Sequence, residues 1–221
     1  MPHRIPCLRE LVRTFFADYL RLVEPDSAVH LRLDRATLLP LSPFGEETDE
    51  PETAGVLAEV PTRRGEKVTI LVLLEPEALG PADISRRLGR WFMDLEIRYA
   101  QPVLLSVLYL QGGRPGVTLE AASICKVMDM EILRIFFTAF GVAGSRAEYF
   151  LERPEPVAWA LSALMRPLRH GRARHKWLCR QRIAAAELPA PHRDLLAGAV
   201  DAFLELDPRE TAEYRALTEG R

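Results

Sequence analysis

Apolar positions near the start of the chain recur at the spacing of an α-helix. From Leu8 to Val23 they fall three or four residues apart, and Pro25 ends the pattern. This spacing gathers them on one face of a helix, and a proline cannot continue the regular hydrogen bonding. The pattern therefore predicts an amphipathic helix over residues 8–23.

A strand pattern follows in the middle of the chain. The apolar runs AGVLAEVP (54–61) and VTILVLLEP (68–76) are separated by a short segment that contains Gly65, which predicts a hairpin. Helical periodicity returns over residues 83–100, and a further apolar strand, VLLSVLYLQGG, covers 103–113. A strand, a crossover helix and another apolar strand predict a βαβ unit whose sheet is covered on both faces.

The pattern after residue 115 is less decisive. EILRIFFTAF (131–140) suits either a strand or a helix, with a strand slightly favoured, and the rest has helical periodicity. We expect an α/β fold in two regions. Residues 1–115 form a mixed-sheet core flanked by helices, and residues 116–221 form a mainly helical C-terminal region packed on or next to it.

Composition and charge narrow the classes of protein. The 221 residues carry a formal net charge of −2, so attraction to nucleic acid requires a local basic patch. Cys7, Cys125 and Cys179 are far apart and lack the spacing of metal ligands, and no apolar run is long enough to span a membrane. We expect a soluble cytoplasmic protein with reduced thiols and no membrane partner.

Two carboxylates stand where the strand at 68–77 ends. Glu75 and Glu77 share a face if the strand continues through Pro76, because side chains alternate along a strand. Paired carboxylates at such a strand end are able to hold a divalent cation. The alternative is that Glu-Pro-Glu simply begins a polar loop.

Several segments resemble one known family. LRELVRTFFADYLRLVEP, ISRRLGRWFMDLEIRYAQPVLLSVLYLQGG and EYFLERPEPVAWALSALMRP are similar to the recombination-promoting nuclease (Rpn) and transposase family, and the resemblance covers nearly the whole chain. That family belongs to the PD-(D/E)XK nuclease-like superfamily. The resemblance implies its mixed-sheet fold and the activity of a Mg²⁺-dependent DNA endonuclease.

The catalytic motif of the family is incomplete in this chain. The resemblance places Glu75 at the family's metal-binding Glu, Glu77 at the Gln or Lys that positions water, and Glu10 at an acid of the first helix. The position of the first-strand Asp is Gly55, which offers no side-chain oxygen. Glu59 on the same strand face, or Glu52 before the strand, would then have to replace the Asp in the metal shell. An ionised Glu77 cannot donate a hydrogen bond. We expect an impaired or remodelled site that holds Mg²⁺ only if the enzyme is active.

Two basic groups are candidates for contact with nucleic acid. Arg86, Arg87 and Arg90 open the predicted crossover helix, where they either reach phosphates or pair with acids of the same helix. Residues 166–182 contain no acid, and this segment either displaces counterions from DNA or forms an ordinary solvated face. Its candidate contact residues are Arg172, Arg174, Lys176, Trp177 and Arg180.

The spacing of two histidines argues against a zinc site. His170 and His175 are five residues apart with no acid beside them in the sequence, which does not match a helical zinc motif.

The leading hypothesis is a DNA-associated, nuclease-like protein with an impaired metal site. The alternative is a non-catalytic interaction module that self-associates through its C-terminal helices without binding nucleic acid.

Overall fold

The computed structural model describes residues 4–41, 55–128 and 130–220. Contacts divide the chain into two compact units. The sheet unit comprises residues 23–141, and the helical unit comprises residues 1–22 and 142–221. The predicted boundary at residue 115 lies inside the sheet unit, because two further strands follow it.

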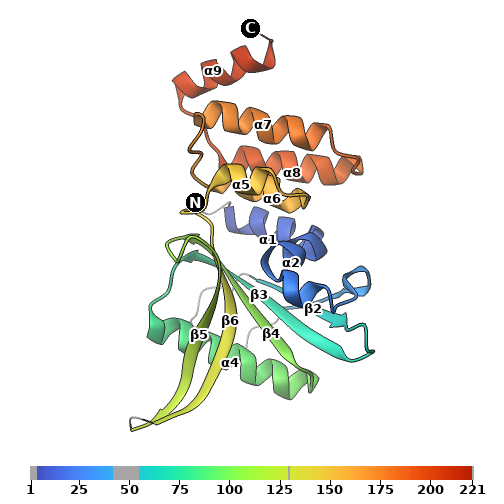
Figure 1. The fold of residues 1–221 in the computed structure, drawn as a ribbon, viewed down its shortest axis with the longest axis vertical. Coiled ribbons are helices and arrows are strands. Elements are labelled where there is room, and N and C mark those ends of the chain that lie inside the picture. The colour runs from blue at the N-terminus through green and yellow to red at the C-terminus, as the bar shows by residue number, and fades with distance from the viewer. Residues whose placement is uncertain (1–3, 42–54, 129, 221) are drawn as a thin grey trace. The chain divides into compact units, whose positions relative to one another are not determined.

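The sheet unit is built on one mixed six-stranded sheet with the strand order β1-β2-β3-β4-β6-β5 (Figure 1). Its strands are β1 (Thr37–Leu39), β2 (Gly55–Pro61), β3 (Lys67–Glu77), β4 (Val103–Gln111), β5 (Gly116–Val127) and β6 (Met130–Gly141). β2 and β3 form the predicted antiparallel hairpin, and β3 and β4 run parallel on either side of the crossover helix α4 (Pro81–Tyr99). The hairpin, the βαβ unit and the α/β fold class are confirmed.

The segment for which helix and strand were both open is a strand. β6 pairs in parallel with β4 and in antiparallel with β5, whose register shifts near Cys125. A short helix α3 (Pro25–Ala28) and a 3₁₀ helix η1 (Leu33–Arg35) precede the sheet. The run of apolar residues in β6 therefore fills a place in the sheet that periodicity alone did not assign.

The helical unit contains the helices expected toward the C-terminus. They are α5 (Ala147–Leu151), α6 (Pro156–Leu161), the 3₁₀ helix η2 (Ser162–Leu164), α7 (Arg172–Ala184), α8 (Ala190–Phe203) and α9 (Pro208–Thr218). The predicted N-terminal helix is divided into α1 (Arg4–Thr14) and α2 (Phe16–Val23), with a break at Phe15. α2 ends at Val23 as predicted, and Pro25 is the first residue of the separate short helix α3.

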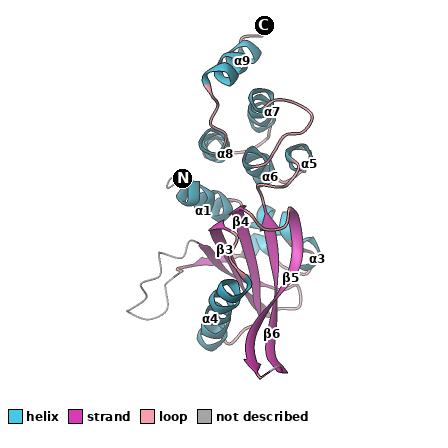
Figure 2. Cartoon of the chain, turned by 90° about the vertical axis from the view of Figure 1, so that its left-hand side faces the viewer, coloured by secondary structure: helices cyan, strands magenta, loops and turns pink. Residues whose placement is uncertain are grey.

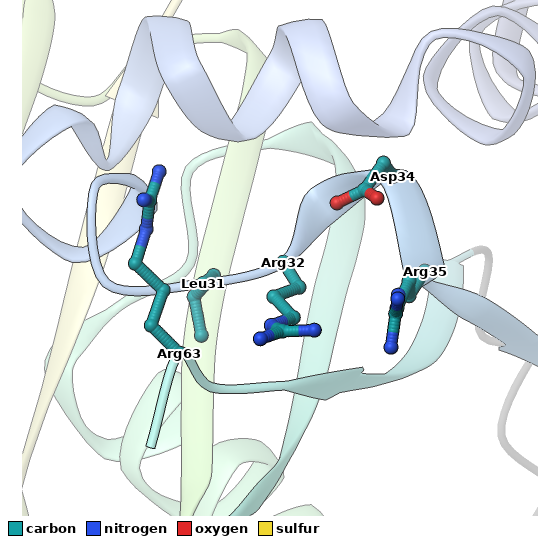
Figure 3. Close-up of a pocket in the computed structure, with 5 residues that line it drawn as sticks. All are labelled: Leu31, Arg32, Asp34, Arg35 and Arg63. Carbon is teal, nitrogen blue, oxygen red and sulfur yellow. The ribbon is translucent and has the colours of Figure 1, made fainter. Parts of the chain in front are cut away.

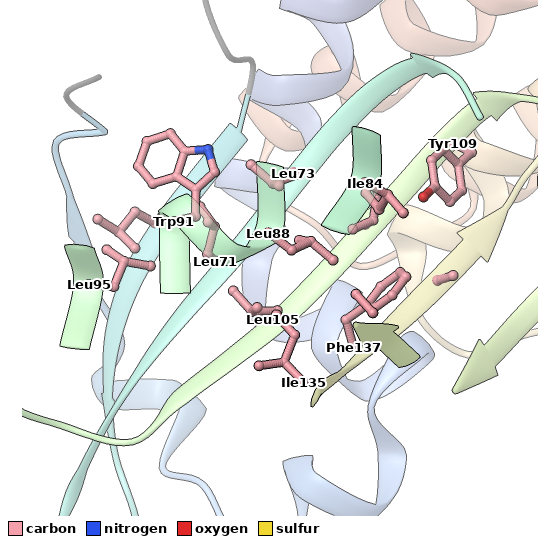
Figure 4. Packing of buried hydrophobic residues seen from close by; sticks show 14 residues of the cluster. Leu71, Leu73, Ile84, Leu88, Trp91, Leu95, Leu105, Tyr109, Ile135 and Phe137 are labelled. Carbon is pink, nitrogen blue, oxygen red and sulfur yellow. The ribbon is translucent and has the colours of Figure 1, made fainter. Parts of the chain in front are cut away.

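One face of the sheet is covered by α4, as Figure 2 shows. Apolar side chains of α4 pack against strand residues in one buried cluster (Figure 4). Leu88 is fully buried at its centre, and Gly89 lets the helix approach β5, since a Cβ there would lie 2.8 Å from Ile124 Cγ2. This packing fixes α4 over the carboxyl end of β3, where the predicted site residues stand.

Truncating Leu88 tests this core. Leu88→Ala removes a fully buried side chain, so we expect the free energy of unfolding to fall by about 2–5 kcal/mol. Ile97→Ala is the control, because Ile97 is on the same helix but 79% exposed, and it should change stability by less than about 0.5 kcal/mol. Urea denaturation of both variants measures the difference, and equal losses would contradict this packing.

Candidate functional site

Glu75 is buried at the end of β3 and is held by an arginine of α4. Only 3% of its surface is exposed. Nη1 of Arg87 donates to both carboxylate oxygens of Glu75, each at 2.6 Å. Leaving a buried charge without a partner is costly, so the guanidinium neutralises the carboxylate and ties the strand to its crossover helix.

The neighbouring strand adds a phenol beside this ion pair. Tyr109 of β4 stands opposite Glu75 in the parallel register and is itself buried. Burial, reinforced by the carboxylates of Glu120 and Glu75, raises the pKa of Tyr109 above its ordinary value. The side chain therefore stays a neutral phenol at physiological pH.

The position expected for the family's first-strand acid has no room for a side chain. Gly55 stands directly opposite Leu73 in the β2–β3 ladder, on the face that also carries Glu75. A Cβ built at Gly55 would lie 2.8 Å from the carbonyl oxygen of Val72 and 3.0 Å from Leu41 Cδ2. The backbone contact means that an aspartate could not be accommodated without moving the strands.

The other acids considered as ligands lie elsewhere or are engaged. Glu59 accepts a hydrogen bond from Gln101 at 2.9 Å and forms an ion pair with Lys67 at 2.7 Å. Both contacts lower the pKa of Glu59. Glu77 is exposed beyond Pro76. Glu10 belongs to the helical unit, on α1. Glu52 lies outside the described residues.

The residues present around Glu75 do not fit a divalent cation. A guanidinium already contacts both oxygens of the carboxylate, and the facing position carries no side chain. Across residues 4–41, 55–128 and 130–220, no three His, Cys, Asp or Glu side chains are grouped so that they could hold a metal ion. The counter-charge of Glu75 is thus supplied by the protein itself.

A hollow of about 670 Å³ lies between the start of α4 and strands β4, β5 and β6. Its lining combines apolar side chains such as Phe137 with Tyr109, Ser123, Glu120 and Arg86. Its volume is in the range of small-molecule sites. Arg86 also forms an exposed pair with Asp83 at 3.6 Å, while Arg90 is exposed on the same helix.

The basic segment 166–182 is largely matched by acids that are distant in the sequence. Arg172 pairs with Glu210 of α9 at 3.3 Å, while Lys176 and Arg180 pair with Asp201 of α8 at 3.0 and 3.3 Å. Lys176 also donates to the carbonyl of Leu204 at 3.0 Å. These contacts pair cations of the segment with acids of its own unit, which the sequence analysis did not predict.

The remaining two candidates of that segment differ in exposure. Arg174 is exposed on α7, and Trp177 is half-buried on the same helix. A half-buried indole offers only part of a stacking surface to a base. Of the five residues proposed from this segment, Arg174 therefore keeps the most accessible charge.

A buried polar network in the helical unit was missed by the sequence analysis. The Oγ of Ser162 lies 3.1 Å from Nε2 of His175, whose Nδ1 lies 3.1 Å from Nε2 of His170. The two imidazole rings are stacked with centroids 5.3 Å apart. Cys179 Sγ completes the cluster, 3.3 Å from Ser162 Oγ.

The expectation that no acid stands near these histidines is wrong. Glu148 lies 3.9 Å from His170 and accepts hydrogen bonds from the backbone N–H groups of Leu168 and Arg169, each at 2.7 Å. The acid comes from α5, about twenty residues earlier, so no local spacing could reveal it. Ser162, His175 and Cys179 are fully buried, which makes this chain of groups structural and leaves no access for a substrate.

The buried imidazole predicts a pH dependence of stability. Burial, and secondarily the charge of His170, lowers the pKa of His175 to about 4. Below about pH 6.5 the unfolded chain takes up a proton that the folded chain refuses, so stability falls between about pH 6.5 and 4, by roughly 3 kcal/mol for this group. Urea denaturation across this range should show a shallower decline for His175→Gln than for the unsubstituted chain, and parallel declines would contradict the assignment.

Comparison with known proteins adds no relative. No family model matches the chain, and neither a curated protein nor a solved structure is similar to it. Among the described residues, no helix combines the length and the apolar character needed to cross a membrane. The geometry of the chain itself therefore carries the evidence for its function.

Proposed function

We propose that the chain is a DNA-associated, nuclease-like protein of the Rpn type that has exchanged metal-dependent cleavage for binding. The observation that carries this proposal is the ion pair of Glu75 and Arg87, with contacts of 2.6 Å to both carboxylate oxygens. In a nuclease of this kind the same carboxylate would hold Mg²⁺. Here its charge is neutralised by a guanidinium.

The exchange removes the chemistry of hydrolysis but keeps a positive charge. A metal ion lowers the pKa of a bound water and neutralises the charge that builds on the phosphate. A guanidinium is a hydrogen-bond donor with no open coordination position, so it cannot generate a hydroxide. The lack of space at Gly55 supports the same conclusion, since a second carboxylate cannot stand at this position of β2, on the face that carries Glu75.

Contact with DNA is assigned first to the exposed arginines of α4. Arg86 and Arg90 are exposed near the start of that helix, whereas Arg87 is committed to Glu75. The basic residues of α7 would have to leave Glu210 and Asp201 before they could reach a phosphate. Arg86 would have to leave only Asp83, an exposed partner at 3.6 Å, so α7 is the weaker candidate surface.

The absence of cleavage is the first test. Plasmid DNA incubated with Mg²⁺ or Mn²⁺ should stay intact, and neither ion should raise the melting temperature of the protein, because a ligand that binds only the folded state would stabilise it. A gel shift with the same DNA should occur and should weaken steeply with salt. Cleavage that disappears in Glu75→Ala would overturn the proposal, and the lack of any shift at low salt would remove its DNA component.

A double-mutant cycle tests the ion pair independently. Arg87→Gln removes the guanidinium that neutralises a buried carboxylate, so we expect a loss of about 3–5 kcal/mol in the free energy of unfolding. The double variant Glu75→Gln with Arg87→Gln should be less destabilised, because both charges are then absent. Additive losses in urea denaturation would show that the two side chains do not interact.

A second candidate function is favoured by a specific surface. Leu119 of β5 and Phe136 of β6 are 72% and 63% exposed on the same side of the sheet, with Val117 and Ile132 nearby in the two strands. Exposed apolar groups of this kind mark contact surfaces for protein partners. This observation supports a protein-interaction module, with a second copy of the chain as the partner.

Self-association through this surface has a direct test. If the exposed apolar surface around Leu119 and Phe136 pairs two copies, light scattering should give a dimer mass for the unsubstituted chain. The double variant Leu119→Ser with Phe136→Ser should then give a monomer mass. Val29→Ser is the control, because Val29 is 59% exposed elsewhere in the sheet unit. A monomer mass for the unsubstituted chain would exclude this candidate.

A further inference from the structure

A short backbone ladder in the sheet unit brings two separated arginines together. Leu31 and Thr62 form an isolated β-bridge. On its two sides the N–H of Arg32 donates to the carbonyl of Pro61 and the N–H of Arg63 donates to that of His30, both at 2.8 Å. The positions of Arg32 and Arg63 are therefore set by backbone hydrogen bonds and by the buried side chain of Leu31.

The 3₁₀ helix η1 adds a third arginine. Arg32 immediately precedes η1, and Arg35 is its last residue, one turn further on. In Figure 3 the side chains of Arg32 and Arg35 extend toward the same side of this segment. The side chain of Leu33 in η1 is buried and anchors this short helix, while Arg32 and Arg35 stay exposed.

These side chains border an open hollow of about 320 Å³, which we call the arginine hollow. It is lined by Leu31, Arg32, Asp34, Arg35 and Arg63. Three arginines and one aspartate line it, so the lining has an excess of positive charge. Within the described residues none of these arginines forms an ion pair within 4.0 Å, in contrast to Arg87, Arg172 and Arg180.

Three arginines without an ion pair among the described residues give the lining a positive potential, which an anion would offset. Like charges at short range repel even near a protein surface, where the effective dielectric constant is about 20. Guanidinium groups match the oxygens of a phosphate with paired N–H donors, which gives charge-assisted hydrogen bonds. The lining has one apolar side chain, Leu31, so an apolar ligand would find little surface to bury.

We propose that the arginine hollow is a binding site for a phosphate group. Two sources share this chemistry: the backbone of a nucleic acid, in which case the inference rests on the proposed DNA association, and free phosphate or a small phosphate ester. Arg32 and Arg63 donate from opposite sides of the ladder, and Arg35 adds its donors from η1. No local pattern in the sequence reveals this site, because Arg63 is about thirty residues from Arg32 and Arg35, and the ladder joins these segments only in the fold.

The experiment uses the full chain and two charge-matched variants. Arg32→Gln with Arg63→Gln removes two arginines of the hollow, while Arg64→Gln with Arg209→Gln removes two exposed arginines that do not line it. Binding of inorganic phosphate is followed by NMR of the arginine side-chain N–H groups, against chloride at equal ionic strength. Binding of a labelled DNA duplex is followed by fluorescence anisotropy across a salt series.

We expect phosphate to shift the arginine signals of the unsubstituted chain and of the control, and the hollow variant to bind phosphate at least about tenfold more weakly. If the hollow also contacts DNA, the slope of log affinity against log salt should fall by about two in the hollow variant, which loses two phosphate contacts. Phosphate binding without a change in DNA binding supports the small-anion source.

The outcomes separate the failure of this inference from the failure of the proposed function. If the hollow variant loses phosphate binding and no form of the protein binds DNA, the arginine hollow is supported as a phosphate site and the proposed DNA association is overturned. No response to phosphate in the unsubstituted chain, or equal weakening in the hollow variant and the control, overturns the hollow. Circular dichroism of the three proteins confirms that the substitutions leave the fold intact, since all four arginines are exposed.

Discussion

The buried ion pair of Glu75 and Arg87 is the constraint around which the candidate site is organised. An apolar strand that ends in a buried carboxylate requires a positive partner, and the first turns of α4 provide it. A divalent cation would satisfy the same requirement with different chemistry, because it also activates water. A guanidinium offers no open coordination position, and this difference separates the proposed binding function from metal-dependent cleavage. Gly55 reinforces the choice, since the strand contacts leave no space for a second acid.

Positive charge is used in two different ways in the two units. On α7 the cations face acids of α8 and α9, so their charge serves to hold helices together. The arginine hollow is lined by three arginines and a single aspartate, and backbone hydrogen bonds of the adjoining ladder hold Arg32 and Arg63 in place. Solvated charges that already have partners gain little from a ligand, whereas charges without an ion-pair partner gain more from an anion that fits. Local density of basic residues in the sequence is thus a poor guide to where an anion binds.

The network of Ser162, His175, His170 and Glu148 shows a further use of polar side chains. Its groups could suggest a catalytic relay, but Ser162 and His175 have no access to solvent. Inside a packed unit such a network satisfies buried polar atoms and fixes the relation of η2 to α7. The low pKa of His175 follows mainly from this burial. The same arrangement makes the helical unit sensitive to acid without requiring any activity.

The sequence by itself determined the elements whose periodicity reports burial: the β2–β3 hairpin, the β3–α4–β4 crossover and the C-terminal helices. It also identified Glu75 as the carboxylate at a strand end. Only the tertiary structure decided that Arg87 neutralises Glu75, that β6 joins the sheet, and that Glu148 reaches His170. Alternation and helical spacing reveal which side of an element is buried, because they are properties of neighbouring residues. Partners between elements depend on how the chain returns on itself, and no local pattern records that.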